Sequence, residues 1–307
     1  MQHYRSLGDI QLNSAWLTIG SFDGVHKGHQ SIINEITAGA QKNSVPAVVL
    51  TFYPHPAAVL HGQNYPYYLS SPEEKAEIFK DLGIDILITH PFNRDIANKS
   101  ARQFLTEINQ QLNIQHIQIG YDFALGKNRE GNFTTLKELG KEFGFSVNQS
   151  QPVSDEDGII SSSRIRFLLG VGQVQKASTL LGRNYQLNGI VEVGDRRGQS
   201  LGFPTANLSV WAEKVIPTAG VYACWATVQG QRLAAVTNIG VRPTFEKRPV
   251  APRVEAHLLG FSKDIYGESI QLAFVSRLRD ERKFPSTDTL IRQIGKDTQE
   301  ARRILSS

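Results

Sequence analysis

Cysteine is almost absent from this chain of 307 residues, in which Cys224 stands alone. A single cysteine cannot form a disulfide within one chain, and it excludes the zinc sites that need several thiolate ligands. A reducing compartment is therefore predicted, and the cytoplasm is the simplest such location. Cys224 lies in a strand-like run, and we expect it to be a small core residue without a role in the chemistry.

Long apolar runs and a strong charge of one sign are also missing. No stretch approaches the roughly 18 apolar residues of a membrane helix, and residues 1–16 lack the basic-then-apolar pattern of a secretory signal. The net charge is only +4, and no long basic run stands out. We therefore expect no membrane and no nucleic acid among the partners, and no obligate protein partner is evident.

The length and the apolar content predict two domains. At roughly 150 residues per domain, 307 residues suffice for two, and an apolar share of 40% can build two cores. In the first part of the chain, strand-like runs (16–20, 47–52, 84–89, 116–120) alternate with helical patterns (29–40, 71–83, 100–112, 134–144). This alternation predicts βαβ crossovers and a parallel sheet that helices cover on both faces.

Helix signals are clearest at residues 71–83. Ser71 is a predicted N-cap, Pro72 stands at the first helical position, Glu74 can close a capping box, and Gly83 ends the helix. Two further short helices are predicted at 161–169 and 173–182.

The pattern changes near residue 186. From there to about 278, strand-like runs follow one another with turns between them, for example at 229–230 and 266–267. This predicts a small antiparallel β-barrel, followed by a terminal helix at about 286–305. We place the domain boundary so that the domains are 1–185 and 186–307.

The segment GSFDGVHKGH, residues 20–29, directly follows the first predicted strand and opens the first helix. Glycines let a ligand approach the backbone there, and a helix N-terminus favours anions. His26 and His29 could donate hydrogen bonds to phosphate oxygens and stabilise charge that develops at phosphorus. Two alternatives are a metal site, for which a third ligand is not nearby, and a glycine-rich turn with two solvated histidines. The segment matches neither the Walker pattern nor GxGxxG.

A second group of polar residues begins at the 194–198 segment, GDRRG, which alone is typical of a basic hairpin tip. Thr205 and Asn207 follow, two residues apart in an extended segment, so their side chains point to the same side. A hydroxyl and an amide oxygen suit Mg²⁺, but Thr and Asn also commonly cap turns. The residues alone do not decide between a metal site and a turn.

Glu255 lies in the middle of the strand-like run RVEAHLLGF. Strand alternation puts it opposite Val254 and Ala256 and on the same side as His257. That side could face the barrel interior or the solvent, and a surface glutamate is the default interpretation.

The longer segment TIGSFDGVHKGHQ resembles the bifunctional bacterial riboflavin kinase/FAD synthetase family, whose nucleotidyltransferase domain carries HxGH. The resemblance runs from about residue 16 to about 300 through segments in the same order: TFYPHP (51–56), GYDFALGKNREG (120–131), SSSRIRFLL (161–169), LGFPTANL (201–208), NIGVRPTF (238–245), VEAHLLGF (254–261) and SRLRDERKF (276–284). It implies a Rossmann-like nucleotidyltransferase domain at 1–185 and a riboflavin kinase barrel at 186–307. Riboflavin and ATP would give FMN, and FMN with a second ATP would give FAD and pyrophosphate. Mg²⁺ would be the cofactor.

The resemblance also implies site residues for adenylyl transfer. His26 and His29 would bind and neutralise the ATP phosphates. The implied contacts to ATP or flavin in this domain are Gly20, Phe22, Asp23, Gly24, His55, Asp122, Phe123, Ser162, Ser163 and Arg166. Ser163 stands where the family commonly has Thr, and Asp122 where it often has Asn. For His55 a surface loop is the alternative, and Arg164 could be a surface charge.

For the kinase, the resemblance implies that Thr205 and Asn207 hold Mg²⁺ with ATP. Glu255 would take the proton from the ribityl 5′-hydroxyl, so that this oxygen attacks the γ-phosphorus. The implied contacts to ATP or flavin are Gly194, Arg197, Gly198, Gly202, Phe203, Pro204, Asn238, Phe245 and Arg279. Arg277 and Arg279 could equally be solvated charges.

Two other functions remain open from the sequence. One is a nucleotidyltransferase with a different phosphorylated substrate, against which the PTAN segment (204–207) and Glu255 argue. The other is a flavin-binding or nucleic-acid-binding protein built on the barrel, although the chain lacks an aromatic stripe interleaved with basic residues. The predicted partners are the small molecules riboflavin, FMN and ATP.

Overall fold

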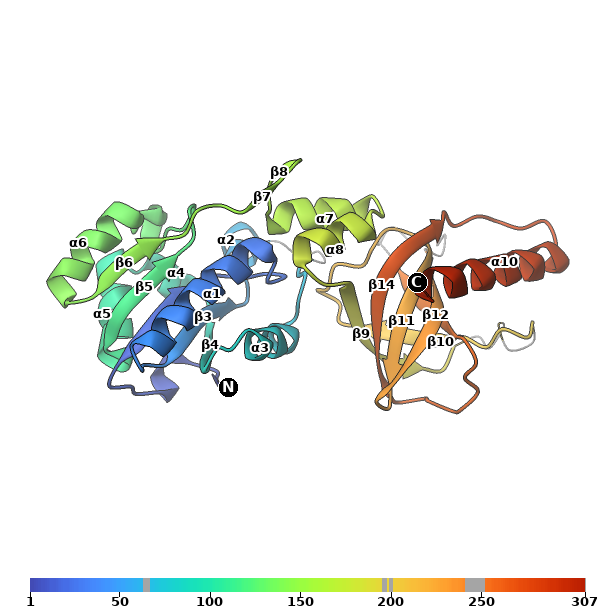
Figure 1. Cartoon of the computed structure of the whole chain (residues 1–307), viewed down its shortest axis with the longest axis horizontal. Helices are drawn as coiled ribbons and strands as arrows, with labels where there is room; N and C mark the ends of the chain where they lie inside the picture. The colour runs from blue at the N-terminus through green and yellow to red at the C-terminus, as the bar shows by residue number, and fades with distance from the viewer. Residues whose placement is uncertain (63–66, 195–197, 199–200, 241–251, 307) are drawn as a thin grey trace. The chain divides into compact units, whose positions relative to one another are not determined.

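The computed structural model describes residues 1–62, 67–194, 198, 201–240 and 252–306. By its internal contacts the chain divides into two compact units, Met1–Ser162 and Ser163–Ser307 (Figure 1). Within the described ranges, none of the helices combines the length and the apolar character that crossing a membrane requires.

The first unit is built on a six-stranded sheet in which every neighbouring pair is parallel. The strand order is β1(Gln2–Tyr4), β4(Ile86–Pro91), β3(Ala47–Tyr53), β2(Ala15–Ile19), β5(Ile114–Ile119) and β6(Ser146–Gln149). The predicted parallel sheet is confirmed. The edge strands β1 and β6 were not predicted, because such short runs show no clear period.

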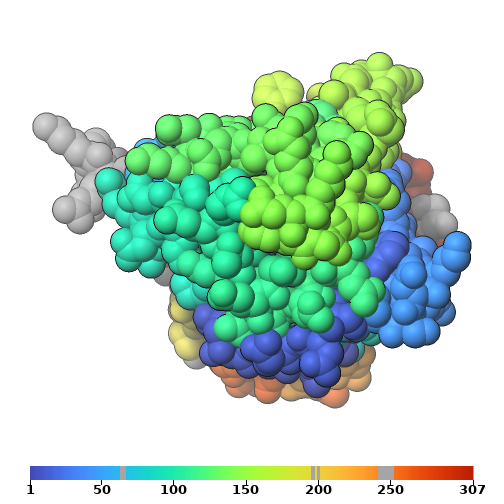
Figure 2. All heavy atoms as spheres, turned by 90° about the vertical axis from the view of Figure 1, so that its left-hand side faces the viewer, coloured from blue at the N-terminus to red at the C-terminus, as the bar shows by residue number. Residues whose placement is uncertain are grey.

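Helices cover both faces of this sheet, as Figure 1 shows. α1(Lys27–Lys42) and α3(Pro72–Asp81) pack on one face, and α5(Ala101–Leu112) and α6(Phe133–Phe143) pack on the other. The strands alternate accordingly: in β3, Val48 and Leu50 face α5, whereas Val49 faces α1. In Figure 2 the green residues of α5 and α6 form much of the surface that faces the viewer.

Shorter elements complete the first unit: η1(Leu7–Asp9), α2(Pro56–His61), α4(Arg94–Asn98), η2(Lys127–Arg129), β7(Ser154–Asp155) and β8(Gly158–Ile159). The predicted start of α3 is confirmed. Ser71 accepts a hydrogen bond from the Glu74 backbone, the Glu74 side chain closes the capping box, and Pro72 opens the helix.

The second unit is a closed antiparallel barrel with helices outside it, as predicted. The strand order is β10(Ala206–Val210), β13(Arg253–Leu258), β12(Gln231–Gly240), β11(Gly220–Val228), β14(Ser269–Arg279) and β9(Tyr185–Glu192). Tyr222 and Phe274 fill the interior, with ring centroids 5.3 Å apart. α10(Thr287–Leu305) packs on the outer surface of β11 and β12, where Ala301 and Leu305 contact Val221 and Val236.

Two helices before the barrel belong to the second unit by their contacts. α8(Val174–Leu181) packs against β14 and β9, and the carbonyl oxygen of Leu169 in α7(Ser162–Gly170) accepts a hydrogen bond from the Thr218 backbone. The division between the compact units therefore falls before the boundary that the sequence pattern placed at 185/186.

Candidate active sites

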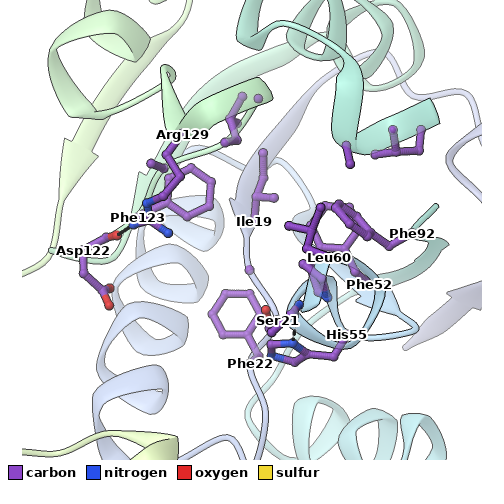
Figure 3. Close-up of a pocket in the computed structure, with 18 of the residues that line it drawn as sticks. Ile19, Ser21, Phe22, Phe52, His55, Leu60, Phe92, Asp122, Phe123 and Arg129 are labelled. Atoms are coloured by element: carbon purple, nitrogen blue, oxygen red, sulfur yellow. Dashed lines mark hydrogen bonds between the residues drawn. The ribbon is translucent and has the colours of Figure 1, made fainter. Parts of the chain in front are cut away.

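A cavity of about 810 Å³ opens at the carboxyl ends of the parallel strands. In Figure 3, Asp122, Phe123 and Arg129 lie on one side of it and Phe52 and Phe92 on the other. The sequence-predicted residues that line it are Gly20, Phe22, Asp23, His29, His55, Asp122, Phe123 and Ser162. Segments far apart in the sequence thus meet at one cleft, where parallel sheets commonly bind ligands.

His26 and His29 have different positions, because His29 lines the cavity whereas His26 is buried and is not among the residues that line it. His26 is buried and caps α1, because its Nδ1 accepts a hydrogen bond from the His29 backbone at 3.4 Å. The two rings stack with centroids 3.7 Å apart. His29 itself lines the cavity, and its buried Nδ1 has no hydrogen-bond partner among the described residues.

Burial lowers the pKa of His29 well below 6.5, and the nearby His26 and Lys75 lower it further. His29 is therefore neutral at neutral pH and carries one N–H donor. A bound polyphosphate would raise the pKa of His29, because negative charge favours the imidazolium. The neutral ring of His29 can therefore offer one N–H donor to a bound anion.

Asp23 is 2% exposed and fixes the turn that follows β2. Its carboxylate accepts hydrogen bonds from the backbones of Leu69 (2.9 Å) and Ser70 (3.2 Å). The backbone of Gly24 donates to Ser70 Oγ, and Ser162 Oγ donates to the Asp23 carbonyl oxygen. Asp23 and Gly24, which the resemblance predicts as ligand contacts, thus anchor the wall of the cavity.

His55 and Phe22 lie at the same end of the cavity (Figure 3). The Nδ1 of His55 accepts a hydrogen bond from the Ala57 backbone at 3.1 Å and so caps α2. Phe22 has a φ of 48°, in the left-handed region, and its ring meets His29 edge-on at 5.2 Å. His55 is thus a cavity residue and not simply a loop histidine.

Lys127 and Arg129 also line the cavity, although sequence reasoning did not single them out. Nη2 of Arg129 donates to the Asp122 carbonyl oxygen at 2.7 Å. Both residues lie in the 120–131 segment that carried the family resemblance, and two cations close together there were an available signal. Ser163 and Arg166, on α7, belong to the second compact unit.

The barrel brings together three predicted residues in one row. Glu255 of β13 is in register with Asn207 of β10 on one side and with Asn238 of β12 on the other. Directly opposite residues of neighbouring strands point to the same face of a sheet. Val254 and Ala256 are buried, whereas Glu255 is half-buried. The row therefore lies on the outer face of the barrel, which settles the alternative that the sequence left open.

Residues before the PTAN segment approach this row closely. A Cβ on Gly194 would lie 2.0 Å from the Asn207 amide nitrogen, and one on Gly198 would lie 2.3 Å from the Phe203 carbonyl oxygen and 3.2 Å from Thr205 Oγ1. A residue without a Cβ is needed at both positions, so that the backbone at Gly194 and Gly198 can pass directly beside Thr205 and Asn207. The predicted residues Arg197 and Phe245 lie outside the described residues.

The PTAN segment is held in place from β13. His257 Nδ1 donates to the Pro204 carbonyl oxygen at 2.8 Å, and its ring meets Phe203 edge-on at 5.5 Å. Gly202 provides the left-handed turn before them, with a φ of 82°. These contacts set the direction in which the segment enters β10.

Oxygen atoms in this row and in Thr205, which precedes β10, suit a hard cation. A hydroxyl (Thr205), an amide oxygen (Asn207) and a carboxylate (Glu255) are ligands or neighbours that Mg²⁺ accepts when phosphate and water complete its shell. In the part of the chain that the structure describes, no cluster of three or more His, Cys, Asp or Glu side chains suits a metal. The residues thus fit Mg²⁺ bound together with a phosphate and not a protein-only cage.

The two arginines of β14 are held by protein groups. Arg279 donates to the Asp297 carboxylate of α10 at 2.8–3.1 Å, and its side chain is 19% exposed. Arg277 donates to the Ala219 carbonyl oxygen at 2.7 Å and pairs with Asp280 at 2.9 Å. Neither arginine is a fully solvated charge, and Arg279 ties α10 to the barrel.

Comparisons with known proteins match both parts of the chain. A family model of FAD synthetase matches residues 9–164, and a family model of riboflavin kinase matches residues 181–305. Relatives named bifunctional riboflavin kinase/FMN adenylyltransferase include a Bacillus subtilis protein that is 40% identical over 95% of this chain and 92% of that protein. A Haemophilus influenzae relative of the same name is 35% identical over 100% of both chains.

A solved structure resembles the whole chain. It is described as a macrolide-efflux protein from Streptococcus pneumoniae, with 32% identity, a TM-score of 0.89 and 98% coverage of both chains. This likeness shows that the folds of both units recur in an experimental structure.

Proposed function

Since the chain belongs to the family of bifunctional riboflavin kinases/FMN adenylyltransferases, we propose that its two sites divide the two reactions between them. The enzyme phosphorylates riboflavin with ATP to FMN and adenylylates FMN with ATP to FAD. We assign FMN adenylylation to residues 1–185 and riboflavin phosphorylation to residues 186–307. The observation that carries the assignment is the row of Asn207, Glu255 and Asn238 on the barrel, separate from the cavity at His29.

In the kinase step, Glu255 accepts the proton of the riboflavin 5′-hydroxyl while that oxygen bonds to the γ-phosphorus of ATP. The bond from the γ-phosphorus to the bridging oxygen breaks, and ADP leaves. Thr205 and Asn207 would hold Mg²⁺, which neutralises phosphate charge when bound. Glu255 is half-buried beside two amide side chains, so it can reach a substrate.

In the adenylylation step, a phosphate oxygen of FMN attacks the α-phosphorus of ATP, and pyrophosphate leaves. His29 donates a hydrogen bond to a phosphate oxygen and stabilises the charge that develops there. His26 fixes the helix start and the ring of His29 by its cap and its stacking contact. Phe123 on one side of the cavity and Phe52 and Phe92 on the other (Figure 3) offer apolar surface to the flavin ring.

The other residues implied by the resemblance keep their proposed roles. In the first site the ATP and flavin contacts are Gly20, Phe22, Asp23, Gly24, His55, Asp122, Phe123, Ser162, Ser163 and Arg166. In the kinase site they are Gly194, Arg197, Gly198, Gly202, Phe203, Pro204, Asn238, Phe245 and Arg279. We propose a cytoplasmic location, because the one cysteine, Cys224, cannot form a disulfide within the chain.

The test is to incubate the purified chain with riboflavin, ATP and Mg²⁺ and to separate the flavins by chromatography. We expect FMN to form first and FAD to follow, with ADP and pyrophosphate as the other products. Conversion of supplied FMN to FAD without any FMN formation from riboflavin would overturn the kinase assignment. Binding of flavin without consumption of ATP would overturn both.

A further inference from the structure

Lys75, on the first turns of α3, is a lysine buried behind the cavity wall. It is 3% exposed, and its Nζ donates to the Ser21 carbonyl oxygen at 3.1 Å and to Thr51 Oγ1 at 3.2 Å. Thr51 Oγ1 also donates to the Ser21 carbonyl oxygen, at 3.1 Å. Two donors thus hold one backbone carbonyl of the turn that follows β2.

The turn that Lys75 holds forms part of the cavity. Ser21 lines the cavity between Gly20 and Phe22, so the ammonium approaches the turn through the carbonyl of a lining residue. The positive charge of Lys75 also acts on the cavity itself, because it contributes to the lowered pKa of the lining residue His29. Asp23 and Glu73 offset the charge only in part, since burial still lowers the pKa of Lys75 from 10.5 to about 8.

Burial of this ammonium destabilises the fold, because a charged amine prefers water. A hydrocarbon side chain of similar length would fill the same space without this cost. The Lys75 ammonium is unfavourable for folding, but it lies next to the turn proposed to bind phosphate. A fixed charge placed in this way is a form of electrostatic preorganisation.

We propose that Lys75 is a positioning residue for adenylyl transfer, whose buried positive charge fixes the Ser21 turn and attracts the phosphates of ATP from behind it. This inference rests on the function proposed for the first unit. Lys75 does not touch the substrate; it acts through Ser21 and through the electrostatic potential at His29.

The pH dependence of the reaction follows from the groups that face Lys75. They are Asp23 from the turn, Glu73 from α3, His29 from α1 and His3 from β1. In the free enzyme Lys75 loses its proton at a pKa of about 8. Bound ATP adds negative charge and raises that pKa. We therefore expect kcat/KM, which reports the free enzyme, to fall as the pH rises through this pKa. The corresponding fall in kcat, which reports the complex with ATP, should lie at higher pH.

The experiment compares Lys75→Met with Lys80→Met in the full chain. Lys80 is an exposed lysine of the same helix, with a side chain 62% exposed, so it controls for the loss of one charge. FMN adenylylation is measured from about pH 6 to pH 10, with riboflavin phosphorylation measured on the same preparations. For Lys75→Met we expect a KM for ATP raised about tenfold or more at pH 7, which is ~1.4 kcal/mol, and no alkaline fall of kcat/KM near pH 8. Lys80→Met and the kinase reaction should match the parent.

A purely structural Lys75 gives a different result, namely a changed melting temperature with an unchanged KM and pH profile, and this would overturn the proposal. If Lys75→Met does not fold, Thr51→Val serves instead. It removes an acceptor from the ammonium, lowers the pKa of Lys75 and should move the alkaline fall to lower pH. A parent enzyme that makes FAD without any alkaline fall in kcat/KM overturns this inference alone. A parent enzyme that makes no FAD from FMN overturns the proposed function as well.

Discussion

The substitution Asp23→Asn tests whether the Asp23 carboxylate stabilises the turn at the adenylylation site. The carboxylate is 2% exposed, accepts backbone hydrogen bonds from Leu69 (2.9 and 3.1 Å) and Ser70 (3.2 Å), and raises the pKa of Lys75. An asparagine has one acceptor oxygen in place of two, and it removes the negative charge that offsets Lys75.

The magnitude follows from these contacts. Leaving a buried backbone donor without its acceptor typically costs about 1–3 kcal/mol. At roughly 2–4 °C per kcal/mol for a unit of this size, the first unit should melt roughly 2–12 °C lower. At pH 9 the loss should be smaller, because Lys75, with a pKa of about 8, is then neutral in the parent as well.

Differential scanning calorimetry at pH 7 and pH 9 measures both effects, and the transition of the second unit should stay in place. Asp85→Asn is the matched control, since this exposed carboxylate accepts one backbone hydrogen bond, from Ala47 at 2.9 Å. If Asp23→Asn melts together with Asp85→Asn at pH 7, the assignment of Asp23 as the buried anchor is refuted.

Four further outcomes are expected. His29→Ala should lower FMN adenylylation by about 10²–10³ and leave riboflavin phosphorylation intact; equal rates of FAD formation would remove His29 from the reaction. Glu255→Gln should lower FMN formation by ~10²–10⁴ while supplied FMN is still converted to FAD, and a normal kinase rate would make Glu255 a surface residue. A fragment 163–307 should fold and phosphorylate riboflavin, whereas 186–307 should melt lower because it lacks the packing of α8 on β14; identical melting curves would contradict this. Relative to Lys75→Met, the parent should gain stability as the pH rises from about 8 to 10.5, since the unfolded chain then holds a proton that the folded chain has released; a pH-independent difference in unfolding free energy would speak against the buried ammonium.

The sequence predicted the layered fold well where periods were long enough to read. The strand at 47–52 was found from its run of apolar residues. The helix at 71–83 was found because its apolar spacing coincides with a complete capping box. β1 was not predicted, because its three residues, Gln2–Tyr4, are too few to show an alternation of apolar and polar side chains. The barrel was predicted from successive strands and turns, but only the strand register shows which face of β13 is outside.

The site was less accessible to sequence reasoning. The motif residues were found because they stand close together in the chain, as His26 and His29 do. Lys75 was missed, because a lysine on a helix is normally solvated. Its spacing of four residues from the buried Phe79 places it on the core-facing side of α3, and this was the available signal. The ion pair of Arg279 with Asp297 joins residues 18 positions apart and left no pattern.

The row on the barrel constrains how this chain can change in length. Asn207, Glu255 and Asn238 come from three separate strands, so their alignment depends on the ladder between β10, β13 and β12. Deleting one residue from β13 ahead of Glu255 would turn the carboxylate inward and bring a neighbouring apolar side chain outward. Insertions between strands leave the ladder intact. Variants of this protein that keep kinase activity should therefore accumulate gains and losses of residues in the connections, and almost none within these three strands.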